Sequence, residues 1–290
     1  MRNWKYEALL ASVIAARSTS FIFSKMALTD MGVFNLLAVR FLLAFLLLLA
    51  LFFKRLAGMG RYELFSGIAV GSLYFLVMVC ELNALKLAPT STVSLLENCS
   101  IIFVPLFEAV LVRRFPDKTT VICTLAAMLG VLCITLHQGG LSGGMTLGLL
   151  AAVVYAAVII VTGRLSARAK DPLCIGVVEI GTMGMLALAS SFVFETPRLP
   201  ANGSQWLMIL ALAVVCTGFG FTLQPVAQSR VSVERAGLFC AIEPAIATIL
   251  GVAVLSERFG VLSAAGLLLI LLSIILPYMM SSADSNRNDS

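Results

Sequence analysis

Charged side chains that interrupt long apolar segments are the residues of this chain best suited to chemistry. Two are basic and five are acidic: Arg17, Arg40, Glu81, Glu97, Glu108, Glu179 and Glu243. An ionisable group at the centre of a bilayer costs about 2.5–3.5 kcal/mol on insertion scales, so such groups face protein or water and are functional candidates. Pairing each base with one acid leaves three carboxyl groups, which must be protonated, hydrated or close to a surface.

The depth of each group within its segment predicts its partner. Arg17 and Glu243 each lie about ten residues into a segment, near the midplane at 1.5 Å of rise per residue. Arg40 and Glu97 form a second expected pair, nearer the outer surface. Because a guanidinium holds a carboxylate by two parallel hydrogen bonds, Arg17 would also suit an amino acid or another organic acid. Binding of the solute and pairing with Glu243 both remain open.

Helical spacing gathers the polar residues of three segments into stripes. The stripes are Thr90, Ser94, Glu97, Ile101 and Glu108; Thr217, Phe221, Gln224 and Gln228; and Gly67, Gly71, Tyr74, Met78 and Glu81. Such stripes line a hydrated pathway or, alternatively, hold helices together. Tyr74, Tyr155, Phe219 and Phe221 would stack on an apolar solute or pack in the core.

Three prolines stand inside apolar segments, where each removes a helical hydrogen bond. The resulting kinks serve either as gating hinges or only as shape. The predicted gating residues are Pro105, Pro225 and Pro244. The predicted substrate-binding residues are Arg17, Tyr74, Glu97, Tyr155, Phe221, Gln224 and Glu243.

These residues are positioned by membrane-spanning helices. The chain has 290 residues, 60% of them hydrophobic and 12% charged, with a mean hydropathy of +1.02. Ordinary soluble domains are about 25% charged. Runs that are apolar on every face exclude a β-barrel and predict an all-α membrane protein. Ten spans are expected, at 7–27, 34–53, 62–85, 89–112, 118–137, 143–163, 172–194, 205–228, 233–255 and 260–280.

The distribution of positive charge predicts the topology. Ten spans place fourteen of the twenty Lys and Arg residues on one side of the membrane and four on the other. Positive residues favour the cytoplasm, so both termini are expected to be cytoplasmic in a multi-pass protein of the inner (plasma) membrane. The polar tail at 281–290 is expected to be disordered.

An internal repeat divides the chain in two. An offset of 144 residues aligns Glu97–Phe115 with Ala241–Phe259, with 7 of 19 positions identical. Five spans in each half make the second half enter the membrane from the opposite face. The expected units are therefore two inverted five-helix repeats, 1–138 and 143–280, around a central cavity, with the solute site near the midplane.

Two segments resemble the EamA-type drug/metabolite transporter superfamily. AIEPAIATILGVAVLSERF (Ala241–Phe259), after Gln224-Pro225, is similar to its ninth-helix signature, and ALKLAPTSTVSLLENCSIIFVPLF (Ala84–Phe107) to its fourth-helix pattern. The resemblance implies a ten-helix bundle that moves small organic solutes such as amino acids, other metabolites or drugs, usually outward. Where many members have a Trp in the first helix, this chain has Arg17, which makes that position pocket-lining by resemblance.

The sequence lacks the motifs that other classes of function would need. The one histidine and seven cysteines provide no metal-binding spacing, and neither a phosphate loop nor an acidic diphosphate-binding motif is present. We therefore expect no catalytic residue, metal, cofactor or nucleic-acid partner. The predicted function is a secondary transporter working by alternating access, as an exporter, with protons as a candidate coupling ion and a monomeric or homodimeric state. The alternatives are a polytopic membrane enzyme and a channel-like facilitator.

Overall fold

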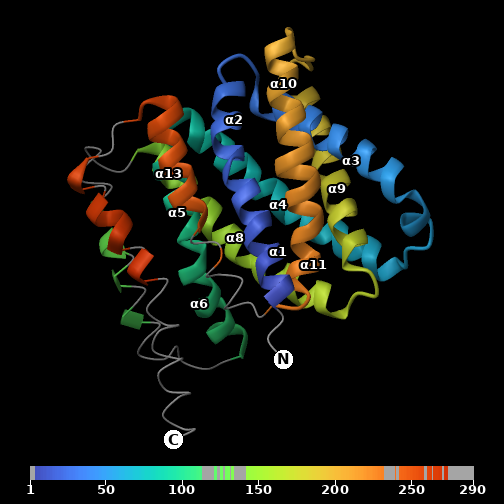
Figure 1. The fold of residues 1–290 in the computed structure, drawn as a ribbon, viewed down its shortest axis with the longest axis horizontal. Helices are drawn as coiled ribbons and strands as arrows, with labels where there is room; N and C mark the ends of the chain where they lie inside the picture. Colours follow the sequence, from blue (N-terminus) through green and yellow to red (C-terminus); the bar gives the residue numbers. More distant parts are fainter. Residues whose placement is uncertain are drawn as a thin grey trace, which may run out of the picture.

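A computed structural model of the chain shows a bundle of helices (Figure 1). It describes residues 4–112, 121–122, 125–126, 128–130, 132–133, 142–231, 239, 242–257, 260–262, 264–269 and 271–273. Regular structure within these ranges is helical throughout. The elements are α1 (Trp4–Ser18), α2 (Ser20–Ala27), α3 (Val33–Ala57), α4 (Arg61–Leu87), α5 (Thr90–Asn98), α6 (Ser100–Val112), α8 (Gly143–Arg168), α9 (Pro172–Phe194), α10 (Gly203–Ala211), the π-helix η1 (Leu212–Phe221), α11 (Thr222–Gln228) and α13 (Ile242–Leu255).

Seven of the expected spans are present at full length among the described residues. They are Trp4–Ala27, Val33–Ala57, Arg61–Leu87, Thr90–Leu111, Gly143–Arg168, Pro172–Phe194 and Gly203–Gln228. The span expected at 233–255 is described from Ile242 on, as α13. The spans expected at 118–137 and 260–280 fall largely or partly outside the described residues.

Two of the spans are broken near their middle by polar residues. The first changes from α1 to α2 at Thr19, whose hydroxyl donates to the backbone oxygen of Ala16 at 2.7 Å. The other changes from α5 to α6 at Cys99, beside Asn98, whose side-chain amide donates to the backbone oxygen of Ser94 at 2.9 Å. Such side-chain bonds compete with the helical ladder and favour a local bend.

The direction of the helices shows that the second repeat is inverted. We call the end of the bundle where α2 finishes the far end; the N-terminus lies at the other, near end (Figure 1). At the far end, the ammonium of Lys25 donates to the backbone oxygen of Ala88, and α8 begins where Gly144 packs against Ala88. The first helix of the second repeat therefore starts at the end where the first helix of the first repeat finishes.

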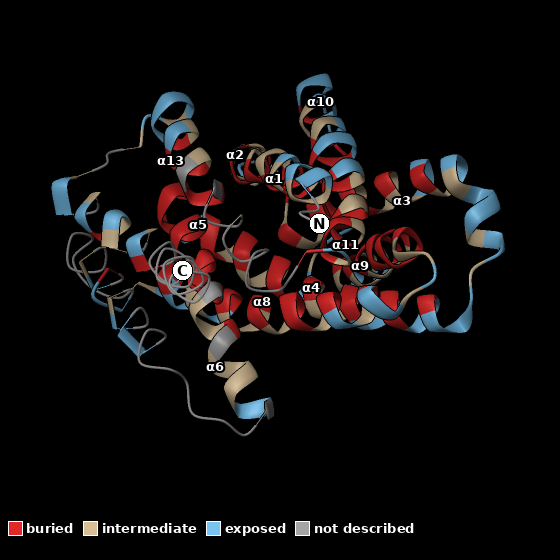
Figure 2. Cartoon of the chain, turned by 60° about the horizontal axis from the view of Figure 1, so that its bottom comes forward, coloured by how far each residue is buried: buried red, intermediate tan, exposed pale blue. Residues whose placement is uncertain are grey.

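Packing between helices follows the same two-fold relation. The contact of α4 with α8 has its counterpart in that of α1 with η1, and the contact of α5 with α8 has its counterpart in that of α13 with α1. The equivalent helices α3 and α9 pack on each other, as do α5 and α13. The interior is thus formed by both repeats together, and Figure 2 shows buried residues along α4 and α8.

Small residues let α4 approach α9 closely. A Cβ added at Gly67 would lie 2.5 Å from Cβ of Val178, and one added at Gly71 would lie 2.6 Å from the backbone oxygen of Glu179. These two members of the predicted polar stripe therefore serve helix packing, the alternative that the sequence left open. Tyr74, in the same stripe, turns into the interior and is 1% exposed.

Large apolar side chains cover the outside of the bundle. Leu51 of α3, Phe65 of α4 and Phe192 of α9 are each more than 60% exposed. Soluble monomers rarely show contiguous apolar patches beyond a few hundred Å². An apolar exterior around a core that holds buried charges is the arrangement expected of helices in a lipid bilayer.

Candidate functional site

The interior of the bundle holds a polar cluster centred on Arg17, which is 3% exposed. The two N–H groups of its Nη1 are shared among three acceptors: the hydroxyl of Tyr74 at 2.8 Å, the hydroxyl of Tyr155 at 3.1 Å and Oε1 of Gln224 at 2.5 Å. Arg17 and Tyr74 belong to the first repeat, whereas Tyr155 and Gln224 belong to the second. The cluster therefore lies across the junction of the two repeats.

Aromatic rings surround the guanidinium. Its central carbon lies 4.5 Å from the ring centre of Phe221, 5.4 Å from that of Tyr74 and 5.6 Å from that of Tyr155. A cation over an aromatic face at these distances is stabilised by the ring quadrupole, more so away from water. The rings also contact one another, with centres of Tyr74 and Phe221 4.9 Å apart. Together they offer an apolar lining beside a positive charge.

Local helix geometry brings these side chains together. Arg17 is in the last turn of α1, next to the break at Thr19. Its aliphatic stem passes Gly220, where an added Cβ would lie 2.7 Å from Cγ of Arg17. Phe221 ends the π-helix η1, a rare element that recurs at functional sites.

Pro225 lies just after a change in helix type beside the site, where η1 gives way to α11 after Phe221. Lacking an N–H group, Pro225 cannot donate to the backbone oxygen of Phe221 four residues earlier. Gln224, the residue before Pro225, is 2% exposed and contacts Arg17.

Part of the guanidinium has no hydrogen-bond partner among the described residues. All three hydrogen bonds start from Nη1, and Nε and Nη2 of Arg17 donate to none of the described residues. These two groups point in parallel from one edge of the guanidinium and match the two oxygens of a carboxylate. A carboxylate placed along this edge would leave the bonds from Nη1 that position Arg17 intact.

The expected ion pair between Arg17 and Glu243 is not formed. No ion pair within 4.0 Å joins them in the described structure, although Glu243 is near enough to interact with the guanidinium electrostatically. Glu243, in the first turn of α13, is 2% exposed and neighbours Asn98. The two repeats thus place a carboxyl group near Arg17 without neutralising it by direct contact.

The expected pair of Arg40 with Glu97 is wrong. Nε of Arg40 donates to the hydroxyl of Thr217 at 2.7 Å, and its Nη1 donates to that of Ser24 at 3.4 Å. The carboxyl group that interacts with Arg40 is that of Glu81. Depth along a helix does not determine which face each side chain occupies.

Buried acids outnumber buried bases in this part of the bundle. Glu97 neighbours both Glu81 and Glu243, and its carboxyl group is close enough to that of Glu81 for a hydrogen bond between them when one of the two carries a proton. Glu179 lies on α9 within electrostatic range of Arg17. Four carboxyl groups therefore share an interior with two guanidinium groups. Glu108, the fifth acid, is partly exposed and pairs with Arg164 at 3.8 Å.

The predicted site residues separate into three groups. Arg17, Tyr74, Tyr155, Phe221 and Gln224 are in direct contact, whereas Glu97 and Glu243 interact with this cluster only at longer range. Phe219, named as a stacking candidate, is 39% exposed and faces away from the site. Pro225 lies inside α11, Pro244 in the first turn of α13 as described, and Pro105 in α6 with its side chain outside the described residues.

Sequence reasoning missed two residues that shape the site. Gly220 leaves room for the stem of Arg17, and Asn98 neighbours Glu243. Asn98 could have been found as an amide directly after Glu97 in an apolar segment. Gly220 gives no such signal, because its partner is 203 positions away and on the other repeat. In the described ranges, no three His, Cys, Asp or Glu side chains are arranged to hold a metal ion.

Comparisons with known proteins agree with this architecture. The model of the EamA-like transporter family matches the chain twice, at residues 4–136 and 142–279. An uncharacterized transporter of Bacillus subtilis (strain 168), YetK, is 25% identical over 268 residues, which are 86% of this chain and 79% of that protein. A solved crystal structure superposes with a TM-score of 0.71 at 20% identity, covering 96% of this chain and 98% of the other.

The crystal structure shares the fold, and the family match carries the assignment. Two matches in tandem also account for the repeat, and the predicted all-α membrane architecture and the predicted resemblance are both confirmed. The protein is a multi-pass membrane transporter, and the chain belongs to the EamA-like transporter family.

Proposed function

We propose that this chain is a secondary transporter of small organic solutes that carry a carboxylate, such as amino acids, and that Arg17 binds this carboxylate. The observation that supports it is the edge of the guanidinium formed by Nε and Nη2, which donates to none of the described residues. An arginine that deep in a membrane protein needs an anionic or polar partner. A solute carboxylate supplies one with two charge-assisted hydrogen bonds.

The aromatic rings around Arg17 determine which solutes are preferred beyond the carboxylate. Phe221, Tyr74 and Tyr155 surround the guanidinium with ring faces and edges. A solute with an apolar or aromatic side chain would pack on these rings while its carboxylate meets Arg17. Amino acids and other organic acids with an apolar portion are therefore the proposed solutes.

Transport is proposed to follow alternating access. The cluster draws residues from both repeats, so a tilt of one repeat against the other would change the access to Arg17 from one side to the other. The breaks at Thr19 and Cys99 lie beside the site and give α1 and α5 places to bend.

The proposed direction is export across the inner membrane, with both termini in the cytoplasm. The excess of Lys and Arg on one side supports this orientation. A reporter fused at Ser290 and one inserted near Arg114 should then both be cytoplasmic. An external signal from either reporter contradicts the orientation.

Uptake into proteoliposomes tests the solute class. Pairs of compounds that differ only in the carboxylate, such as an amino acid and its amide, should be separated by about tenfold or more in apparent affinity. Uptake measured with and without a pH gradient tests proton coupling. Solute placed on the opposite side should accelerate uptake by exchange, whereas a channel-like facilitator shows no such acceleration. Equal handling of both members of every pair would exclude the carboxylate role.

A further inference from the structure

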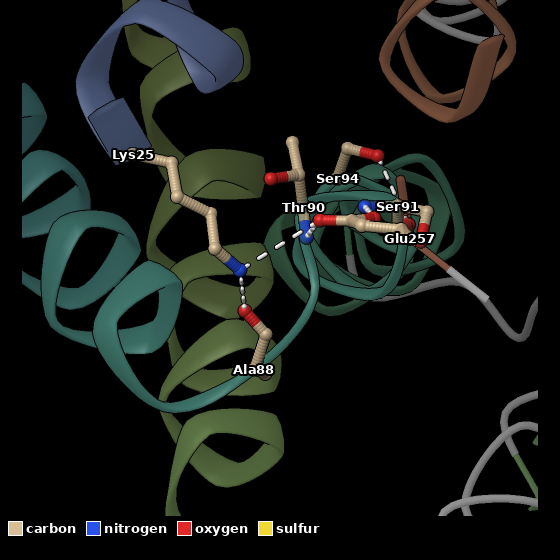
Figure 3. Close-up of polar contacts among 6 residues, drawn as sticks. All are labelled: Lys25, Ala88, Thr90, Ser91, Ser94 and Glu257. Carbon is tan, nitrogen blue, oxygen red and sulfur yellow. Dashed lines mark hydrogen bonds and ion pairs between the residues drawn. The ribbon is translucent and has the colours of Figure 1, made fainter. Parts of the chain in front are cut away.

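A second group of charged residues lies away from the Arg17 cluster, at the far end of the bundle. The carboxylate of Glu257, which follows α13, accepts three hydrogen bonds from the first turn of α5 (Figure 3). The donors are the backbone N–H of Thr90 at 2.6 Å, the backbone N–H of Ser91 at 3.1 Å and the hydroxyl of Ser91 at 2.9 Å. A carboxylate at this position also interacts favourably with the helix dipole.

Lys25 ties a third segment to the same carboxylate. Its Nζ lies 3.7 Å from Oε1 of Glu257 and donates to the backbone oxygen of Ala88 at 2.7 Å (Figure 3). The end of α2, the turn between α4 and α5 and the segment after α13 are thus joined through one carboxyl group. The side chain of Glu257 is only 8% exposed, so water weakens these bonds little.

The backbone around Glu257 is shaped to aim its side chain at α5. Ser256 has a φ of 52°, the only positive φ at a non-glycine residue in the described chain. This left-handed residue ends α13 and turns the chain back, and the N–H of Glu257 donates to the backbone oxygen of Gly251 at 3.2 Å. A Cβ at Gly251 would lie 2.8 Å from Oε2 of Glu257. Ser256 and Gly251 thus both orient the carboxylate of Glu257. Backbone strain of this kind is found where a functional conformation depends on it.

These bonds connect the two repeats. Lys25, Thr90 and Ser91 belong to the first repeat and Glu257 to the second. Tilting one repeat against the other must stretch or break contacts that cross between them at one end. In the first repeat, the 144-residue offset places Arg113 at the position of Glu257, so the carboxylate is a feature of one end only.

We propose that Glu257, Lys25 and the first turn of α5 form a latch that holds the far end closed and must open for solute to pass there. The proposal rests on the alternating access proposed above. With the N-terminus in the cytoplasm, the far end is the outer end. In the described structure, the latch residues do not contact the Arg17 cluster. They set how often the outer side opens.

Reagent access to Ser94 tests the latch. Ser94 is fully buried one turn beyond Thr90 on α5, and Figure 3 shows it next to the latch. It is changed to Cys in a full-length chain whose native cysteines are replaced. A membrane-impermeant maleimide is added to intact cells and to inverted vesicles, so that either orientation is covered. Glu257→Gln and Lys25→Gln should each speed labelling from the far side about tenfold.

Glu63→Gln is the matched control. Glu63 is a buried carboxylate at the start of α4 and accepts a hydrogen bond from the backbone N–H of Lys170 at 3.0 Å, so it also joins the two repeats, but at the near end. Its loss should not speed labelling of Ser94→Cys from the far side. Unchanged labelling in both latch variants, or an equal rise in Glu63→Gln, overturns the latch.

Elution as a single species in detergent separates misfolding from opening for every variant. Lys25→Gln provides a second test of the latch that disturbs the fold less. Lys25 is partly exposed, and its loss leaves the helix cap formed by Glu257 in place. The assay uses no solute. A failure of the latch is therefore distinct from a failure of the proposed function, which is measured by uptake.

Discussion

Oε1 of Gln224 accepts a hydrogen bond from Nη1 of Arg17 at 2.5 Å across the junction of the two repeats. Gln224 is neutral, so this contact positions the guanidinium without cancelling its charge. Tyr74 completes the arrangement, because its hydroxyl accepts a hydrogen bond from Nε2 of Gln224 at 3.2 Å. Arg17 is therefore held by neutral polar groups and ring faces, none of which cancels its charge.

The fit between Arg17 and η1 gives a first prediction. Gly220→Ala should move the arginine, since the added Cβ would lie 2.7 Å from Cγ of Arg17 and the neighbouring helices leave little space. Overpacking of this kind costs about 1–3 kcal/mol. We expect weaker carboxylate binding by about tenfold, measured as apparent affinity in proteoliposomes. Gly203→Ala, with no atom within 4 Å of the added Cβ, is the control, and a similar loss in both variants would contradict the fit.

The helices and the membrane class follow from the sequence because hydropathy acts on whole segments. An all-helical membrane bundle is required once runs such as Phe41–Phe53 are apolar on every face. Five of the predicted site residues also meet, because each is a polar or aromatic side chain on an inward face. The repeat offset was visible for a similar reason, since it is carried by many positions together.

Partners across helices did not follow from the sequence. Arg40 was expected to meet Glu97, yet Thr217, 177 positions away, receives its hydrogen bond. Helical depth fixes one coordinate of a side chain, whereas its partner depends on rotation and on crossing angles that packing sets. The π-helix η1 shifts that rotation further, so the contacts of Phe221 and Gln224 depend on an element that the sequence pattern does not reveal.

Surplus acid near the site leads to a second prediction, on proton coupling. Around Glu97 stand Glu81 from α4, Glu243 from α13 and the guanidinium group of Arg17, while Arg40 interacts with Glu81. The charges balance only if some of these carboxyl groups carry protons. Glu97→Gln or Glu243→Gln should therefore flatten the dependence of transport on pH, measured as initial uptake between pH 5 and 8.

Glu108→Gln is the matched control for that measurement, because Glu108 is a partly exposed acid paired with Arg164. It should retain the pH profile of the unmodified chain. If Glu97→Gln and Glu243→Gln both keep that profile as well, neither group is the proton site.

The latch carboxylate yields a third prediction, on stability at low pH. Burial disfavours its charge, but the hydrogen bonds from Thr90 and Ser91 outweigh burial and hold the pKa of Glu257 below its usual range. A carboxyl group whose pKa is lower in the folded state stabilises the fold above its unfolded pKa, and the contribution is lost as the pH falls through the folded pKa. The contribution of Glu257 to the stability of the fold should thus be constant between pH 5 and 8 and fall only below about pH 4.

Thermal unfolding in detergent measures this contribution. The unmodified chain should unfold at a higher temperature than Glu257→Gln by about 2–4 °C for each kcal/mol of stabilisation. This difference should be steady from pH 8 to pH 5 and shrink below about pH 4. A difference that grows as the pH falls would show that the carboxylate is not the stabilising form.

Arg17 carries the last prediction. A charge-assisted contact removed from a dry site lowers affinity by about 1.5–3 kcal/mol, which is about 10- to 150-fold. Arg17→Gln should therefore weaken uptake of carboxylate solutes by that factor and leave neutral solutes nearly unchanged. Arg17→Lys keeps the charge but lacks the paired donors. Its affinity for carboxylate solutes should lie between those of the unmodified chain and Arg17→Gln. Arg40→Gln is the matched control, because Arg40 is equally buried but bonds to Thr217 and Ser24 instead of the cluster. Equal loss of charged and neutral solutes in Arg17→Gln would show that Arg17 only supports the junction of the two repeats.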